Sequence, residues 1–287
     1  MVQFENTGKN LRQIIEKNVS PEVMQWLHEK LDIIINENAT RELYLTYSLI
    51  ASKMDKSIAE IGIDDRELAD FLKIQQANIQ QLGRIYLLQA VLEKDPAFFE
   101  SKVAGIIQVA DTGELETFLK FLILLPNAKH YKTVAVDALR TNIATIFDAI
   151  ALNNPYPGCY FEPQEWNQMF LKAAFMERDL HQIQDIDRMA NAELARIVSD
   201  YAHERWAASR VVAPHFWRPV IHFMDDIRIG DMERLLQSDR PCDREAAALC
   251  CYESGNTNAL QLLESHPELK MAVAEKKIDW NNLNIAY

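Results

Sequence analysis

The chain has 287 residues, of which 48% are hydrophobic, so it is long enough for one large domain or two ordinary ones with a buried core. Its 42 acidic and 30 basic side chains give a formal net charge of −12. Because this average charge repels phosphate and no cluster of lysine and arginine reverses it along the sequence, nucleic acid and anionic membranes are poor candidates as partners.

Apolar residues recur at helical spacing along the first half of the chain. In residues 20–35, Val23, Leu27, Leu31 and Ile34 share one helix face, and Pro21 suits the first turn. Further helices are predicted over residues 40–54, 64–74, 76–93, 95–110, 112–125 and 130–152. We expect the last of these to be one long helix.

Brief polar links join these helices, which makes neighbours in sequence antiparallel neighbours in space. Helix pairs recur at intervals of roughly 35 to 45 residues, the range of armadillo and HEAT repeats. Residues 243–269, with a turn at Gly255, have the form of one degenerate HEAT unit. The sequence therefore predicts an all-α fold of stacked antiparallel hairpins, a degenerate HEAT/armadillo-like superhelix. We expect a single repeat-like domain over residues 1–287, with an N-terminal half to about 152 and a C-terminal half over 153–287.

The compositional break in the chain is the segment 153–175, NNPYPGCYFEPQEWNQMFLKAAF. Each proline shifts the residue before it away from helical geometry, so NNPYP ends the preceding helix. Pro163 then suits the first turn of a new helix, in which Trp166, Phe170 and Leu171 form the inward stripe. We predict a rigid elbow that docks one helical layer on the next.

Signatures of common enzymes are absent from the sequence: it has no glycine-rich phosphate loop and no nucleophile elbow. His203 and Glu204 lack the second histidine of a zinc motif, because position 207 is alanine. Asp185 and Asp187 are predicted to cap the helix that begins near residue 192. The four cysteines contain no Cys-x-x-Cys pair and are expected to be reduced. We expect no metal and no cofactor.

Residues 200–210, DYAHERWAASR, carry a richer set of polar side chains. Helical steps from Leu194 bring Arg205 to the inward side, where a guanidinium needs a carboxylate or carbonyl partner. One interpretation is an ion pair that locks two helices. The other is a polar pocket for an anionic or aromatic metabolite, lined by Arg205, Tyr201, His203 and Trp206.

Two blocks taken together resemble the EboA family, encoded in bacterial ebo gene clusters and described as metabolite-traffic proteins. The resemblance covers residues 153–220: an Asn-Pro-Tyr-Pro turn, a Trp-Asn-Gln-Met helix start, an Asp-Tyr-Ala-His-Glu-Arg-Trp-Ala helix and a Trp-Arg segment. It implies a cytosolic helical protein and transfers no catalytic residue. The candidate binding residues are those of the two blocks: Asn154, Tyr156, Trp166, Asn167, Gln168, Asp200, Tyr201, His203, Glu204, Arg205 and Trp206.

The leading interpretation is a non-catalytic protein that handles a secondary-metabolite precursor, by binding an aromatic or prenylated metabolite or partner proteins of the same cluster. One alternative is an enzyme in which His203 is a general base oriented by Asp200 or Glu204. Another is a protein-interaction scaffold without a ligand. The first residues lack a signal-peptide core, and the longest apolar run, 118–125, is shorter than the about 20 residues of a membrane helix. We therefore expect a cytoplasmic protein without membrane insertion.

Overall fold

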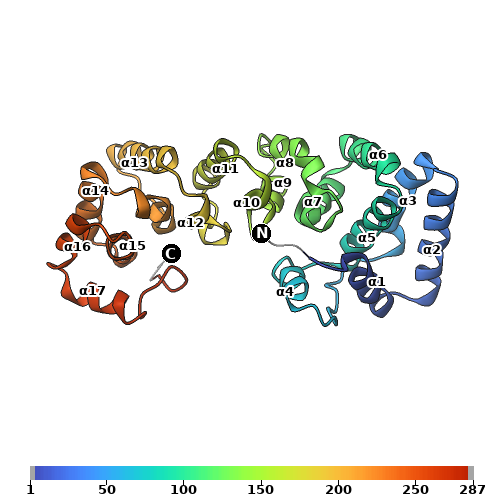
Figure 1. Ribbon diagram of the computed structural model, residues 1–287, viewed down its shortest axis with the longest axis horizontal. Helices are drawn as coiled ribbons and strands as arrows, with labels where there is room; N and C mark the ends of the chain where they lie inside the picture. Colours follow the sequence, from blue (N-terminus) through green and yellow to red (C-terminus); the bar gives the residue numbers. More distant parts are fainter. Residues whose placement is uncertain (1–3, 284–287) are drawn as a thin grey trace. The chain divides into compact units, whose positions relative to one another are not determined.

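A computed structural model describes residues 4–283, in which helices are joined by turns and short irregular segments, with no β-strand (Figure 1). An isolated antiparallel bridge joins Ile58 to Asn78. The all-α prediction is confirmed, while the HEAT-like superhelix stays a prediction. The chain divides into two compact units, Met1–Phe161 and Glu162–Tyr287. No helix within the described residues is long and apolar enough to cross a membrane.

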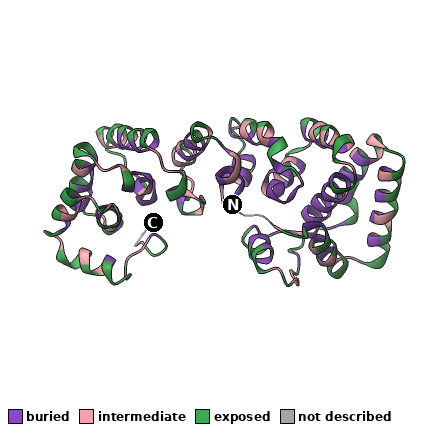
Figure 2. Ribbon diagram, in the orientation of Figure 1, coloured by how far each residue is buried: buried purple, intermediate pink, exposed green. Residues whose placement is uncertain are grey.

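The first unit is built around α5 (Ile79–Lys94), which begins with a capping box formed by Asn78 and Gln81. Buried residues follow almost the whole length of α5, which packs against α1, α2, α3, α6 and α7 (Figure 2). The other helices of the unit are α1 (Thr7–Asn18), α2 (Pro21–Asn36), α3 (Thr40–Lys53), α4 (Arg66–Ile74), α6 (Pro96–Val109), α7 (Thr112–Phe121), η1 (Leu122–Leu124), η2 (Ala128–Tyr131), α8 (Lys132–Ala138), α9 (Ala144–Ala151) and α10 (Tyr156–Tyr160).

The prediction of one long helix over residues 130–152 is wrong, because three shorter helices, η2, α8 and α9, occupy this segment. The chain turns after α8, where the N–H groups of Leu139, Arg140 and Thr141 bond three residues back. The Thr141 hydroxyl then accepts the N–H of Ile143 at 3.1 Å, before α9 begins. A short polar side chain thus offers the backbone a local partner that competes with the helix, and apolar spacing does not register this.

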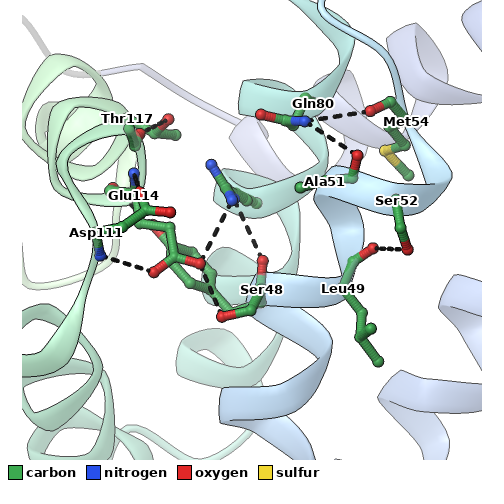
Figure 3. Close-up of polar contacts among 12 residues, drawn as sticks. Ser48, Leu49, Ala51, Ser52, Met54, Gln80, Asp111, Glu114 and Thr117 are labelled. Carbon is green, nitrogen blue, oxygen red and sulfur yellow. Dashed lines mark hydrogen bonds and ion pairs between the residues drawn. The ribbon is translucent and has the colours of Figure 1, made fainter.

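A buried polar network joins three helices of the first unit (Figure 3). The Glu114 carboxylate of α7 accepts the hydroxyl of Ser48 at 2.8 Å and the N–H of Asp111 at 3.1 Å. It also pairs with the Arg84 guanidinium of α5 at 3.4 Å, and the Arg84 side chain is 4% exposed. The Tyr47 hydroxyl donates to the Glu114 backbone carbonyl, and burial raises the pKa of Tyr47. Every charged partner in this network is satisfied, so we interpret it as structural.

The second unit is built around α15 (Pro241–Glu253), which contacts η4, α14, α16 and α17. Three consecutive alanines, Ala246, Ala247 and Ala248, are fully buried there and let neighbouring helices approach closely. Cys250 and Cys251 are also buried and form no disulfide, and burial raises the pKa of Cys251 to about 12. The other helices are α11 (Pro163–Phe175), η3 (Leu180–Gln182), α12 (Ile186–Met189), α13 (Ala192–Ala207), η4 (Pro214–Phe223), α14 (Asp226–Leu236), α16 (Thr257–Leu263) and α17 (Pro267–Ala274).

Candidate functional site

The Asn-Pro-Tyr-Pro turn is held by Asn154, which is 2% exposed. Its side-chain amide donates to the carbonyls of Ala149 at 2.8 Å and Leu119 at 3.1 Å, and its side-chain oxygen accepts the N–H of Tyr156 at 2.9 Å. The Tyr156 hydroxyl donates to the Ala128 carbonyl at 2.9 Å. Both motif residues belong to the first unit and satisfy buried backbone groups, so they stabilise the end of α9 and the short α10.

The helix predicted to restart at Pro163 is observed as α11. Trp166 and Phe170 are fully buried and stack with 5.4 Å between ring centroids. Leu171 is partly buried, and Gln168 is exposed. Of the predicted inward stripe, Trp166 and Phe170 are therefore in the core and Leu171 lies at its edge. Gln168, a candidate binding residue outside that stripe, lies on the outer surface of α11.

Asn167 connects α11 to the start of α13 through a reciprocal pair with Asn191, at 3.1 and 2.9 Å. Asn191 in turn caps α13, because its side-chain oxygen accepts the N–H of Leu194 at 3.0 Å. The prediction that Asp185 and Asp187 cap this helix is wrong. Both carboxylates pair with arginine side chains instead, because α12 separates them from the first turn of α13.

A buried carboxylate on α14, Asp231, joins two side chains of α13. The Ser199 hydroxyl donates to Asp231 Oδ2 at 2.5 Å, and His203 Nε2 lies 2.5 Å from Asp231 Oδ1. The prediction that Asp200 or Glu204 orients His203 is wrong: Asp200 is exposed and pairs with Arg196 at 2.5 Å. Because the carboxylate stands between Ser199 and the imidazole, the histidine does not face the hydroxyl as a base would.

Arg205 is held at the C-terminal end of α13. Its Nε and one terminal nitrogen donate to the Val211 carbonyl at 3.1 and 3.0 Å, and the exposed Glu177 carboxylate lies 3.7 Å away. The Arg205 side chain is 21% exposed. Guanidinium has five N–H donors, so Arg205 keeps donors for a further acceptor. The structure thus gives Arg205 the carbonyl partner that the sequence analysis expected for an inward guanidinium, with a longer contact to an exposed carboxylate beside it.

The cavity that we call the α13 cavity has a volume of 450 Å³ and lies beside Arg205. Tyr201, Arg205, His215, Phe216 and Arg240 are among the residues that border it. The Tyr201 ring contacts Phe216 with 5.1 Å between centroids. The charged side chains of its wall are three arginines and two carboxylates: Arg178, Arg205, Arg240, Glu177 and Asp179. This local balance is positive in a chain of net charge −12.

Trp206 borders a second cavity, of 530 Å³, which shares Val211, Val212 and Arg240 with the α13 cavity. One indole face of Trp206 lies against the buried Trp217, at 5.4 Å and an interplanar angle of 23°. The Arg234 guanidinium lies 4.3 Å from the Trp206 ring centroid, which is cation–π geometry. Trp206 is therefore already packed between protein groups.

The predicted candidate residues do not form one site. Tyr201 and Arg205 border the α13 cavity and Trp206 the neighbouring one, whereas Trp166 and His203 border neither. Asp200 and Glu204 lie with Tyr201 along an open groove of 450 Å³ between α11 and α13. Within residues 4–283, no group of three or more His, Cys, Asp or Glu side chains is arranged to hold a metal ion.

Sequence reasoning missed His215, Phe216 and Arg240 as cavity residues. They lie outside the helix that carries Tyr201 and Arg205, and Arg240 directly precedes α15, in a part of the chain 35 residues beyond Arg205. Only the PHFW sequence in η4 offered a signal, since it places a histidine beside two aromatic residues.

Comparison with family models gives one result. The model described as metabolite traffic protein EboA matches residues 7–221, a range that includes both sequence blocks and the Tyr201, Arg205 and Phe216 wall of the cavity. Comparisons with curated proteins and with solved structures gave no match. Because the match covers well over half of the chain and extends from the first compact unit into the second, the chain belongs to the EboA family of metabolite traffic proteins.

Proposed function

We propose that this protein binds an aromatic metabolite with an anionic group in the α13 cavity and carries it without changing it. The observation that supports this most directly is the convergence of Tyr201 and Arg205 on one cavity. The partly exposed Tyr201 ring, packed against the fully buried Phe216, supplies flat apolar surface, and the unused N–H donors of Arg205 suit a carboxylate or phosphate. The proposal gives the family's metabolite traffic a site and a ligand class.

The proposal predicts that an aromatic carboxylate raises the thermal unfolding midpoint of the full chain. Indole-3-propionate is a suitable probe, and the uncharged indole-3-propanol tests the charge requirement. At a ligand concentration 100 times Kd, the stabilisation is about 2.7 kcal/mol. We expect the carboxylate to stabilise the protein at lower concentration than the alcohol. Equal shifts with both probes contradict an anion-binding role for Arg205.

Arg205→Gln should weaken binding of indole-3-propionate about ten- to a hundred-fold, since a hydrogen bond to a charged group contributes about 1.5–3 kcal/mol. Calorimetric titration measures this change. Arg196→Gln is the matched control, because Arg196 lies on the same helix and pairs only with exposed carboxylates. A loss of affinity in the control equal to that in Arg205→Gln argues against the cavity.

The two alternatives predict different results. A catalytic role for His203 requires that His203→Gln abolish conversion of the bound compound; we expect no conversion by either protein and unchanged affinity, because His203 does not border the α13 cavity. A scaffold without a ligand requires that none of the probes shift the midpoint while another protein of the cluster co-purifies in a stable complex. Either of those outcomes overturns the proposal.

A further inference from the structure

We propose that His215 accepts a hydrogen bond from the ligand, so that the α13 cavity selects aromatic acids that also carry an O–H or N–H group on the ring. This inference rests on the proposed function of the cavity and adds a second recognition element to it. Arg205 and His215 border the same cavity from α13 and η4. One offers donors, and the other offers an acceptor.

The Trp280 backbone carbonyl fixes the tautomer of His215. His215 Nε2 lies 2.7 Å from the Trp280 oxygen, in a buried contact. A carbonyl oxygen can only accept a hydrogen bond, so Nε2 must carry the proton. In a neutral ring the other nitrogen, Nδ1, then has a free lone pair. Within residues 4–283 no protein group donates to Nδ1.

The surroundings keep the ring neutral and in place. His215 is 5% exposed, and burial lowers its pKa. The hydrogen bond to the Trp280 carbonyl and the Asp179 charge oppose this shift, whereas His181 and Arg218 add to it, and the net direction is downward. The ring lies 5.1 Å from that of His181 and 6.0 Å from that of Trp280. A buried ring with one nitrogen bonded and rings on two sides has little freedom to turn, so His215 keeps one orientation at the cavity wall.

The two carboxylates in the cavity wall are less suited to accept a hydrogen bond from a ligand. Glu177 is 77% exposed at its side chain and faces Arg205. Asp179 uses its carboxylate at the start of η3, where it accepts the N–H of His181 and the side-chain amide of Gln182. Unlike these two carboxylates, His215 offers a lone pair that no protein group uses, on a side chain that is only 5% exposed. A ligand donor that pairs with it therefore gains a hydrogen bond in a largely buried setting.

Two aromatic acids that differ by one hydroxyl test the inference: 3-phenylpropionate and 3-(4-hydroxyphenyl)propionate, titrated calorimetrically into the full chain at pH 7.5. We expect the hydroxylated acid to bind about ten-fold more tightly, the effect of one neutral hydrogen bond in a buried site. Indole-3-propionate and its N-methyl derivative provide the same comparison for a ring N–H.

Variants of His215 separate acceptance of a hydrogen bond from packing. Glutamine keeps one donor for the Trp280 carbonyl and one acceptor for the ligand, so His215→Gln should retain most of the ten-fold preference. His215→Leu should bind both acids with equal affinity. Circular dichroism and the unfolding midpoint establish that each variant is folded before it is titrated.

The outcomes distinguish this inference from the proposed function. If the wild-type protein binds both acids equally, the role of His215 is wrong while the cavity still binds aromatic acids. If His215→Leu keeps the preference, another group recognises the hydroxyl and the inference again fails. If neither acid nor the indole probe binds the wild-type protein, the proposed function itself is wrong.

Discussion

At the scale of single residues, polar side chains in this chain mainly satisfy buried backbone groups or one another. Asn154 and Asn191 each bond several backbone groups, and both lie where a helix ends or begins. The sequence singled out Asn154 through its proline-rich surroundings but gave no sign of Glu114 and Arg84. In a sequence, charged residues within helices are typical of a solvated helix surface. Only the packing of α5 against α7 shows that Arg84 and Glu114 are buried.

Glu114→Ala should lower the free energy of unfolding by about 3–5 kcal/mol, because removal of one partner leaves the buried Arg84 without its charge partner. Chemical denaturation followed by circular dichroism measures the change. Glu116→Ala is the control on the same helix: Glu116 forms an i,i+4 pair with Lys120 at 3.8 Å near the surface, which contributes about 0.3–0.5 kcal/mol. Equal effects of the two substitutions would show that the Glu114 network does not stabilise the first unit.

At the scale of elements, α13 is fixed at its start by Asn191 and along its length by contacts with η4 and α14. Ser199 and His203 are one helical turn apart and meet the same carboxylate of Asp231 on α14. Their i,i+4 spacing was visible in the sequence, but their partner was not, because α14 is separated from α13 by η4. Sequence reasoning instead assigned carboxylates from the same helix, which are exposed.

Asp231→Ala should destabilise the protein by about 1–3 kcal/mol, because the Ser199 hydroxyl loses its acceptor in a buried site. Thermal unfolding monitored by circular dichroism provides the readout, with Glu233→Gln, an exposed residue of α14, as the control. In a double-mutant cycle, Ser199→Ala should cost less in the Asp231→Ala background than in the wild type. Full additivity would contradict the contact.

At the scale of the whole molecule, the two compact units contain different parts of the family motif. The turn with Asn154 and Tyr156 belongs to the first unit, and the α13 block belongs to the second. The strongly negative average charge argued against anionic partners, yet arginines from separate segments gather around one cavity in the second unit. Net charge describes the long-range field and not a local pocket, so the two observations are compatible.

The stability of the whole chain should fall as the pH is lowered from 7.5 to 5, in part through His215. Burial lowers the folded-state pKa of His215 below the usual 6.5. Between 6.5 and that lower value the unfolded chain binds a proton that the folded chain does not, so acid favours unfolding in this range. Above pH 6.5 both states are neutral and His215 contributes no pH dependence.

His215→Gln removes this proton uptake, so its unfolding midpoint should fall less between pH 7.5 and 5 than that of the wild type. Groups that act on His215 are His181, Asp179 and Arg218, and all are retained in the variant. His222→Gln is the control, because His222 is an exposed histidine of the same η4 helix. If the unfolding midpoint of His215→Gln falls between pH 7.5 and 5 as much as that of the wild type, groups other than His215 account for the acid sensitivity.

The sequence by itself determined the helical class, most helix positions, the end of a helix near residue 152 and the start of the next helix at Pro163, because helical periodicity and proline geometry are local properties of the chain. It also gave the family, since the two motif blocks are contiguous stretches. Tertiary structure alone decided which side chains meet: Asp231 with His203, Arg84 with Glu114, and His215 and Arg240 with the α13 cavity. These contacts join elements that are distant in sequence, and their partners are set by how the helices pack rather than by any local pattern.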